Sequence, residues 1–324
     1  MEEKKEKKWK WGVNRWIILG LIILSIIGAR LFSPVRPHIQ LAAENLTIEP
    51  IFTLPIIGDF YPTNTFVAMI IVDVIMLLIA FLINRSIKKA QEKGELQLKG
   101  FAGVMEAVFD AIYNLTETTA GKKWAKTIFP YFITITLMVL VANWMEIIPG
   151  VDSIGYLIES EHGYETQQLS TSIAYLLNEE SHHGGYHVVP FVRVLSTDLN
   201  FTVALALISI FMVQVIGLRA QGKKYFSKYW NTKNLFSNPI FGVINFSVGF
   251  MELISELSKI LSFSFRLFGN IFAGSVMLFV IGSLVPVFAQ SLFLGLEIFV
   301  GLIQALVFGM LTMVFMAQSL HSHT

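Results

Sequence analysis

The sequence from Ile240 to Val285 reads IFGVINFSVGFMELISELSKILSFSFRLFGNIFAGSVMLFVIGSLV and contains no cluster of turn residues. As a single helix, these 46 residues would be ~69 Å long at ~1.5 Å per residue. The hydrocarbon core of a bilayer is only ~30 Å thick. The segment therefore either breaks into two spans near a glycine (Gly249, Gly269 or Gly274) or crosses the membrane as one strongly tilted helix.

Arg266 lies within this apolar segment. A charged side chain at the centre of a bilayer costs ~2.5–3.5 kcal/mol on insertion scales, so such residues face a protein partner, a water-filled cavity or an ion path. Arginine also keeps its proton where a desolvated lysine can lose it. A permanent cation at this depth indicates a protein that handles ions or protons.

The composition indicates an integral membrane protein with several spans. Of the 324 residues, 54% are hydrophobic and only 15% are charged, whereas globular domains carry about 25% charged residues. The net charge of +1 does not point to nucleic acid, and the lack of cysteine excludes disulfides, thiolate catalysis and cysteine metal sites. No phosphate loop, dinucleotide fingerprint or nucleophile elbow is present.

Further apolar segments predict membrane helices at about residues 16–32, 65–83, 128–148, 199–218 and 289–320. Lysine and arginine mark the loops that stay in the cytoplasm. The basic segments 1–15, 85–126 and 219–238 are therefore predicted inside, and the segments 34–63 and 151–197 outside. We expect residues 1–33 to be a basic cytoplasmic N-terminus with an uncleaved anchor, or alternatively a signal peptide. Residues 34–324 then form a single membrane domain with an outer loop at 151–197.

A set of polar residues shares one face of the predicted helix around Arg266. At about 100° per residue, its members lie within about 40° of Arg266: Glu252, Ser255, Lys259, Ser262 and Asn270. Such a face can hold membrane helices together through hydrogen bonds. Two charged side chains and an amide in line with a mid-membrane arginine favour an ion path instead. We call these residues, with Arg266, the polar stripe.

The last apolar segment carries Gln290, Glu297 and Gln304 at intervals of seven residues, which places them on one helical face. Glu297 is an intramembrane carboxylate, the type of group that accepts and releases protons along proton paths. The alternative is a carboxylate that only pairs with a basic side chain such as Arg266. We expect the proton-path role.

The decapeptide FRLFGNIFAG at residues 265–274 resembles the signature of subunit a of the F-type ATP synthase, the membrane stator of its proton turbine. Further segments resemble motifs of the same family: NWMEIIPG at 143–150, TDLNFT at 197–202, ISELSKILSFSFR at 254–266 and QALVF at 304–308. Together these similarities cover about residues 100–320.

The resemblance implies an all-α polytopic membrane protein of about six helices, with a long, strongly tilted helix hairpin at the C-terminal end. It makes Arg266 the family's stator arginine and Gln304 its neighbour on the last helix. It divides the remaining candidates between two offset half-channels, a cytoplasmic one with Glu252, Lys259 and Ser262, and an outer one with Asn270, Asp198, Asn200 and Glu297.

The resemblance also implies the partners and the location. The partners would be the c-subunit ring, the b-subunit peripheral stalk, other ATP synthase subunits and membrane lipid, with no nucleic acid. The chain would be a non-catalytic channel subunit without cofactor or metal, in the cell inner membrane, with both termini cytoplasmic. The alternatives are a Na⁺-translocating variant of the same subunit or a secondary ion transporter, although the sequence shows neither the two related halves nor the interrupted helices typical of transporters.

The sequence departs from the family pattern at three places. Ser275 stands where many relatives have glutamate or histidine. The family often exchanges an acid and a histidine between this position and the position of Glu297. In this chain only Glu297 is titratable. The first helix is additional to the five of many members. The long outer loop contains His162, His182, His183 and His187, which we interpret as part of a solvated loop in preference to a metal site or a set of proton-collecting groups.

Overall fold

The computed structural model describes residues 11–31, 40–47, 49–55, 58–94, 100–160, 163–170, 173–180, 184–229, 239–284 and 288–320. The chain divides into two compact units. The larger unit comprises Gln40–Gly155, Pro190–Phe272 and Phe299–Thr324, and the smaller unit comprises Met1–Ile39, Tyr156–Val189 and Ala273–Ile298. Helices α6 (Pro239–Leu284) and α7 (Phe288–Gln318) each contribute residues to both units.

The long apolar segment forms one helix. Helix α6 has 46 residues and continues through Gly249, Gly269 and Gly274, so the alternative of two separate spans is wrong. At ~1.5 Å per residue its length is ~69 Å, more than twice the ~30 Å hydrocarbon thickness. A helix of that length is accommodated in a membrane by tilting or kinking, and its tilt against a c ring remains a prediction.

The other long helices also match the apolar segments, with longer ends. They are α1 (Trp11–Leu31), α2 (Asn64–Lys93), α4 (Lys122–Trp144) and α5 (Leu199–Gln221). Helix α2 continues into the basic segment that the sequence placed after the span, and ends at Gly94 with a left-handed φ of 65°. Its start is capped by Thr63, whose hydroxyl accepts the Phe66 N–H at 3.2 Å.

Five helical segments among the described residues are long and apolar enough to cross a membrane. They are Asn64–Lys93, Lys122–Ile147, Leu199–Gln221, Phe246–Leu284 and Ala289–Gln318. Helix α1, predicted as an anchor, contains a shorter apolar stretch, Arg15–Leu24. Helix α3 (Phe101–Ala120) packs against α4 beyond a break at Gly121, and the rings of Phe109 and Tyr113 meet Phe129 edge to face.

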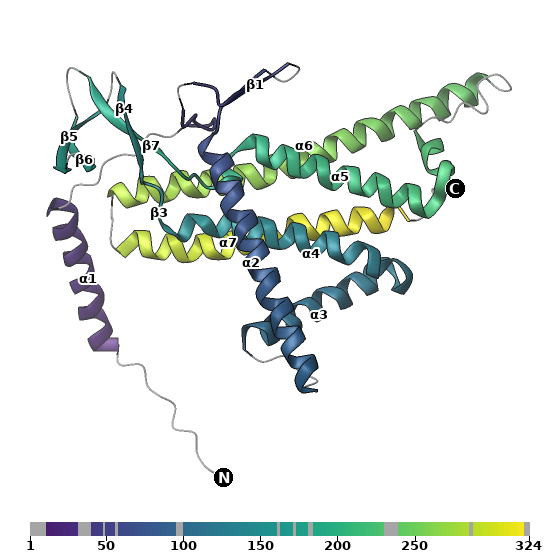
Figure 1. Ribbon diagram of the computed structural model, residues 1–324, viewed down its shortest axis with the longest axis horizontal. Helices are drawn as coiled ribbons and strands as arrows, with labels where there is room; N and C mark the ends of the chain where they lie inside the picture. The colour runs from purple at the N-terminus through teal and green to yellow at the C-terminus, as the bar shows by residue number, and fades with distance from the viewer. Residues whose placement is uncertain are drawn as a thin grey trace, which may run out of the picture. The chain divides into compact units, whose positions relative to one another are not determined.

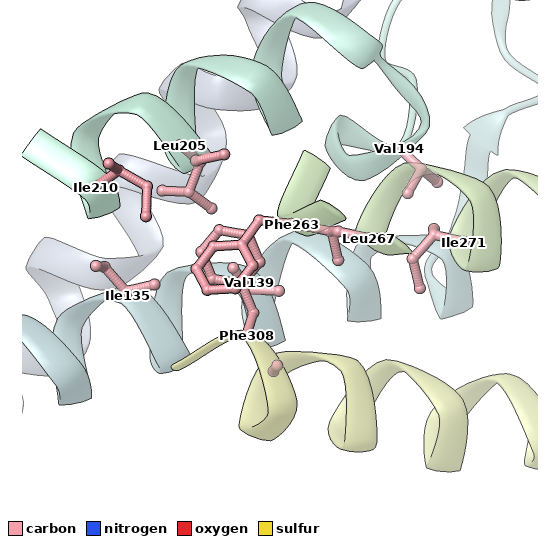
Figure 2. Close-up of a cluster of buried hydrophobic side chains, with 11 residues drawn as sticks. Ile135, Val139, Val194, Leu205, Ile210, Phe263, Leu267, Ile271 and Phe308 are labelled. Carbon is pink, nitrogen blue, oxygen red and sulfur yellow. The ribbon is translucent and has the colours of Figure 1, made fainter. Parts of the chain in front are cut away.

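The core of the larger unit forms where α4, α5, α6 and α7 meet (Figure 2). On α6, Phe263, Leu267 and Ile271 are at most 2% exposed. The ring of Phe263 lies 5.1 Å from that of Phe308 on α7. Helix α2 crosses α4 in the same unit (Figure 1). The three buried residues of α6 lie about 60–140° around the helix from Arg266, at about 100° per residue, so the face that carries Arg266 adjoins the packed face and is exposed.

The predicted outer loop contains strands that the sequence analysis did not anticipate. They are β3 (Pro149–Asp152), β4 (Gly155–Ser160), β5 (Tyr164–Ser170), β6 (Ile173–Glu180) and β7 (Gly185–Pro190). Four of them form a sheet in the order β4-β7-β5-β6, in which β5 and β6 pair antiparallel. A short antiparallel pair, β1 (Phe52–Leu54) and β2 (Gly58–Phe60), precedes α2. Turns of 3₁₀ type, η1 (Met145–Ile147), η2 (Leu195–Thr197) and η3 (Gly222–Lys228), adjoin α4 and α5.

Candidate ion path

The polar stripe of α6 lies on the outward face of the helix. Ser255, Ser262, Arg266 and Asn270 are exposed, and Glu252 and Lys259 are half-buried. Residues of the adjacent face, Phe263 and Leu267, are buried in the core. The helix therefore exposes the part of the stripe around Arg266, as expected of a surface that meets a polar partner at bilayer depth, whereas Glu252 and Lys259 also contact other parts of the larger unit.

Arg266 interacts only locally. Its Nη2 donates to the hydroxyl of Ser262, one helical turn earlier, at 3.1 Å. Within the described part of the larger unit, no carboxylate forms an ion pair with Arg266. An exposed, permanently charged guanidinium on a membrane helix is stabilised by groups outside the chain or by water.

Gln304, the predicted neighbour of Arg266, is half-buried on α7. It precedes Phe308 by one helical turn, and Phe308 packs against Phe263 of α6. The part of α7 that carries Gln304 therefore lies alongside the part of α6 that carries the stripe. Its action on Arg266 remains a prediction.

An ion cluster terminates the polar stripe at the end of α6 nearest to η3. Lys228 Nζ lies 3.5 Å from Glu252 Oε1 and 3.4 Å from Glu256 Oε1. Lys259 Nζ lies 3.1 Å from the same Glu256 oxygen. We call these four residues the lysine–glutamate cluster. It joins two predicted path residues, Glu252 and Lys259, through two residues that the sequence analysis did not select.

Asp198 has a fully engaged carboxylate. Its Oδ2 accepts the hydroxyl of Thr65 on α2 at 2.7 Å, and its Oδ1 accepts the backbone N–H of Asn200 at 2.9 Å. The residue is 6% exposed and caps the first turn of α5. Asn200, the next predicted path residue, is exposed. Asp198 thus ties α5 to α2, and its part in an ion path remains a prediction.

A second buried polar group lies near Asp198. Asn143 accepts the Ser196 hydroxyl on its Oδ1 at 2.6 Å and donates its Nδ2 to the Gly301 carbonyl at 3.1 Å. Gly301 permits this approach, because a Cβ there would lie 3.2 Å from the Asn143 side chain. The motif around Asn143 was noted in the sequence, but its side chain was not selected as a site residue.

Glu297 lies against α6 within the smaller unit. It is 4% exposed, and a Cβ added at Gly274 would lie 2.3 Å from its Oε1. The glycine therefore provides the space that the carboxyl group occupies. Glu297 Oε2 and the hydroxyl of Ser275, the residue after Gly274, are both buried without a hydrogen-bond partner among the described residues. A buried carboxyl oxygen without a donor is costly, and the part of Glu297 in proton exchange remains a prediction.

Asp152 and Arg193 form a further charged pair at the outer segment of the larger unit. Burial raises the pKa of Asp152 to about 6, although Arg193 and a hydrogen bond from the Val194 backbone lower it. Arg193 donates to the Ala42 carbonyl at 2.9 Å and to the Thr197 hydroxyl at 3.2 Å, and also to the Gln40 carbonyl. This arginine thereby ties the segment before α2 to the turn that leads into α5.

The histidines of the outer loop give no metal centre in the described residues. His187 is on β7, whereas His162, His182 and His183 lie outside the residues that the structure describes. Within the described ranges, no group of three His, Cys, Asp or Glu side chains is placed to hold a metal ion.

Comparison with protein families matches residues 66–317 to the family described as ATP synthase A chain. This range contains every motif on which the resemblance rested, and it spans α2 to α7. The chain belongs to the ATP synthase A chain family. Helix α1 lies outside the match, consistent with the additional first helix noted in the sequence.

Curated relatives support this membership. ATP synthase subunit a of Buchnera aphidicola subsp. Baizongia pistaciae is 28% identical over 256 residues, which cover 78% of this chain and 80% of the relative. The protein of the same name from Mycobacterium ulcerans is 25% identical over 69% of this chain and 72% of its own length. The chloroplastic subunit a of Bigelowiella natans is 28% identical over 71% of this chain and 73% of its own length.

Membership in the ATP synthase A chain family makes the chain a membrane subunit of an ATP synthase that works with the other subunits of that complex. The secondary-transporter alternative is set aside by the same finding. The residues that the sequence analysis missed, Lys228 and Glu256, could have been suspected from their charge alone. They were not selected for two reasons. Lys228 belongs to a different segment of the chain from α6, and Glu256 lies outside the stripe, about 80° from Arg266 at about 100° per residue.

Proposed function

We propose that the chain is the proton-translocating stator of the ATP synthase. It provides two offset half-channels to the carboxylates of a rotating c ring, and Arg266 separates them. The observation that carries this proposal is the placement of Arg266 on the outward face of α6, with a hydrogen bond to Ser262 and no ion pair in the described part of its own unit. Such a cation is available to a carboxylate of a neighbouring subunit.

The chemistry follows from the cost of charge in lipid. A ring carboxyl group must be protonated while it faces lipid, because its ionised form is too costly there. Opposite Arg266 the ionised form is favoured, because a nearby cation stabilises a carboxylate. Each acid therefore releases its proton as it approaches Arg266 and takes up another after it has passed.

Arg266 also keeps the two half-channels separate. Arginine does not deprotonate in proteins, so protons cannot move along it from one half-channel to the other. Rotation of the ring is then the route that remains. A proton that crosses ~100 mV releases ~2.3 kcal/mol, so several protons are needed for each ATP.

The cytoplasmic half-channel contains Glu252, Lys259 and Ser262, and the outer half-channel contains Asn270, Asp198, Asn200 and Glu297. The exposure of Ser262 and Asn270 on either side of Arg266 supports this division along α6. The buried Glu297, with one oxygen lacking a donor, supports a titratable role. Gln304, on α7, is assigned a place beside Arg266 of α6.

The partners of the chain are the c ring and the b-subunit peripheral stalk, within the cell inner membrane. We assign protons as the transported ion, with Na⁺ as the alternative. The two ions are distinguished by measuring the rate of ATP-driven transport in a sodium-free and in a sodium-containing buffer, because only transport of Na⁺ requires sodium. Both should be compared at the same total ionic strength.

Both termini are predicted to be cytoplasmic, on the basis of the basic loops and one crossing by α6. The chain has no cysteine, so introduced cysteines at Glu2 and Ser322, which lie outside the described residues, are unique labels. Both should resist a membrane-impermeant thiol reagent in intact cells. Labelling of Ser322 alone would contradict a single crossing by α6.

The test of the main proposal is Arg266→Ala in the assembled synthase. ATP-driven proton pumping into inverted membrane vesicles should fall by at least about a hundredfold, the loss typical of removing a key electrostatic group. Arg219→Ala, an exposed arginine at the end of α5, is the matched control and should pump normally. Pumping by Arg266→Ala at the control rate, with normal assembly, would overturn the proposal.

A further inference from the structure

The lysine–glutamate cluster contains a carboxylate that neither the polar stripe nor the half-channel assignments include. Glu256 is 8% exposed. Both lysines approach the same oxygen, Oε1, at 3.4 Å from Lys228 and 3.1 Å from Lys259. Its other oxygen, Oε2, is buried with no hydrogen-bond donor among the described residues.

This geometry differs from that of a purely structural ion pair. A structural carboxylate in a buried setting normally has both oxygens satisfied, because an unsatisfied buried oxygen costs ~1–3 kcal/mol. Glu256 instead uses one oxygen to hold two ammonium groups and leaves the second uncommitted. An oxygen of this kind is able to accept a proton while Oε1 keeps its hydrogen bonds from both ammonium groups.

Lys228 is held in place by an aromatic clamp formed by Tyr225 and Tyr229. Its Nζ lies 4.4 and 4.5 Å from the centroids of the two rings, within cation–π range. Both tyrosine hydroxyls donate to the same Gln214 oxygen on α5, at 2.8 and 2.9 Å. Gly217 of α5 lies directly beneath the Tyr225 ring, where a Cβ would be 2.3 Å from the ring.

The clamp fixes the lysine against α6 as well as α5. A Cβ at Gly249 of α6 would lie 2.5 Å from the Tyr229 carbonyl, so this part of the chain sits directly on the helix. Burial lowers the pKa of Lys228, but interactions with Tyr229 and Tyr225 outweigh this effect, and the pKa lies above its ordinary value. Lys228 therefore remains a cation at neutral pH.

We propose that Glu256 is an additional proton-relay carboxylate at the end of the polar stripe nearest to η3, and that Lys228 is the residue that positions it. The inference rests on the proposed function, because it extends the cytoplasmic half-channel beyond Glu252 and Lys259. A proton that arrives from the stripe binds Glu256 Oε2, and the same proton then leaves to water. Lys228 and Lys259 keep their own protons throughout.

The charged and titratable groups around Glu256 come from two elements. Glu252 and Lys259 belong to α6, Lys228 to η3, and Tyr225 and Tyr229 to η3 and the residue that follows it. Helix α7 contributes the ring of Phe315, 4.8 Å from Lys259 Nζ. Two carboxylates therefore share two ammonium groups, so one added proton leaves the cluster with a net positive charge that favours its release.

The test uses the complete synthase in inverted membrane vesicles. Glu256→Gln keeps the size of the side chain but cannot exchange a proton, and ATP-driven pumping should fall about tenfold. This is less than the ~10²–10⁴-fold attributed to a single acid–base group, because Glu252 provides a parallel route. Lys228→Met should give a similar loss, and Lys228→Arg should restore most of the rate.

A cysteine experiment separates a relay from a structural ion pair. The chain has no native cysteine, so Glu256→Cys introduces a unique thiol. If protons and water reach this position, Ag⁺ should block the remaining pumping, because it reacts with the thiolate that forms only in contact with water. Leu257→Cys, on the neighbouring exposed apolar position, is the control and should be insensitive.

The outcomes are distinct. If Glu256→Gln pumps at the unmodified rate while Arg266→Ala does not pump, the relay is wrong and the proposed function stands. A slow Glu256→Gln variant combined with an Ag⁺-insensitive Glu256→Cys would mean that the cluster only holds α6 and η3 together, which also overturns the relay. If Arg266→Ala pumps normally, the proposed function itself fails.

Discussion

Two polar regions of the larger unit are held in opposite ways. Around Asp198 and Asn143, each carboxylate or amide oxygen accepts a hydrogen bond from within the chain, two of them from distant segments and one from the first turn of α5. Along α6, Arg266 and Asn270 are exposed, and among the described residues Arg266 bonds only to Ser262 of the same helix. The first region is closed within the chain, whereas the second is open to a partner.

The difference separates positioning from exchange. Thr65 and Asp198 are 133 residues apart, and their bond links α2 to the start of α5. Such a bond is strong because it is buried, and a group that is fully bonded has little freedom to trade a proton. Glu297 of the smaller unit is also buried, but its Oε2 has no donor among the described residues. By this criterion we predict that Glu297 exchanges protons and that Asp198 contributes to the outer half-channel mainly by positioning helices.

The largest expected effect that tests this comparison is on proton flux. Glu297→Gln should lower ATP-driven pumping by about a hundredfold, within the range for loss of an acid–base group, while the complex still assembles. Asp198→Asn should change pumping by less than about threefold, because the asparagine oxygen can still cap α5 and its NH₂ group can donate to the Thr65 hydroxyl. Both are measured in inverted vesicles at equal subunit content.

A double variant sharpens the same test. Ser275 follows Gly274, which lies against the Glu297 carboxyl group. Ser275→Glu combined with Glu297→Gln moves the acid across the helix hairpin and should restore part of the flux. If Glu297→Gln pumps normally and Asp198→Asn does not, the outer path runs through the start of α5 and the comparison is reversed.

The next effect is on stability. Asn143→Ala leaves the Ser196 hydroxyl and the Gly301 carbonyl without their bonds, and it should destabilise the larger unit by about 1–3 kcal/mol. The matched variant is Asn200→Ala at an exposed position, which should cost less than about 0.5 kcal/mol. The thermal midpoint of the chain in the purified complex measures both. Equal midpoints for the two variants would show that the closed network does not hold the helices.

The sequence alone predicts what local pattern can encode. The apolar segments located the long helices, and a helical wheel around Arg266 identified residues that the structure leaves exposed or half-buried on one face of α6. The residues of the long segment left open whether it forms one helix or two, and only the family resemblance favoured the single tilted helix. Polar residues on this face were recognised because they lie on one element.

Contacts between distant segments were beyond the reach of the sequence. Lys228 and Glu256 are 28 residues apart, and their pairing depends on how η3 folds back onto α6. The strands of the outer segment were missed because the polar composition of 151–197 was interpreted as a loop. Exposed and partly buried residues alternate at the start of β5, Tyr164–Ser170, but this alternation is a property of the structure that the polar sequence does not reveal.

The smallest expected effect is on the pH dependence of the outer segment. Asp152 has a pKa of about 6 in the folded chain, raised by burial from an ordinary value of 3.8 despite Arg193. Because the folded state holds this proton more tightly than the unfolded state, the stabilisation is complete below pH 3.8 and is lost as the pH rises to about 6. The full shift corresponds to ~3 kcal/mol, and partial exposure reduces this to on the order of 1 kcal/mol.

Asp152→Asn isolates this contribution, because the amide resembles the protonated acid and also tolerates the left-handed backbone at this position, where φ is 62°. Asp152 N–H donates to the Val192 carbonyl at 3.0 Å, so its hydrogen exchange reports on the local structure. From pH 4 to pH 6, protection of this amide should fall in the unmodified chain and stay constant in the variant, once the intrinsic effect of pH on exchange is removed. Asp59→Asn, at an exposed position of β2, is the control, and in this variant the protection of the Asp152 amide should still fall from pH 4 to pH 6. A constant protection in the unmodified chain would mean that Asp152 is not the titrating group, and that the outer segment, like the region around Asp198, is held by hydrogen bonds that do not depend on pH.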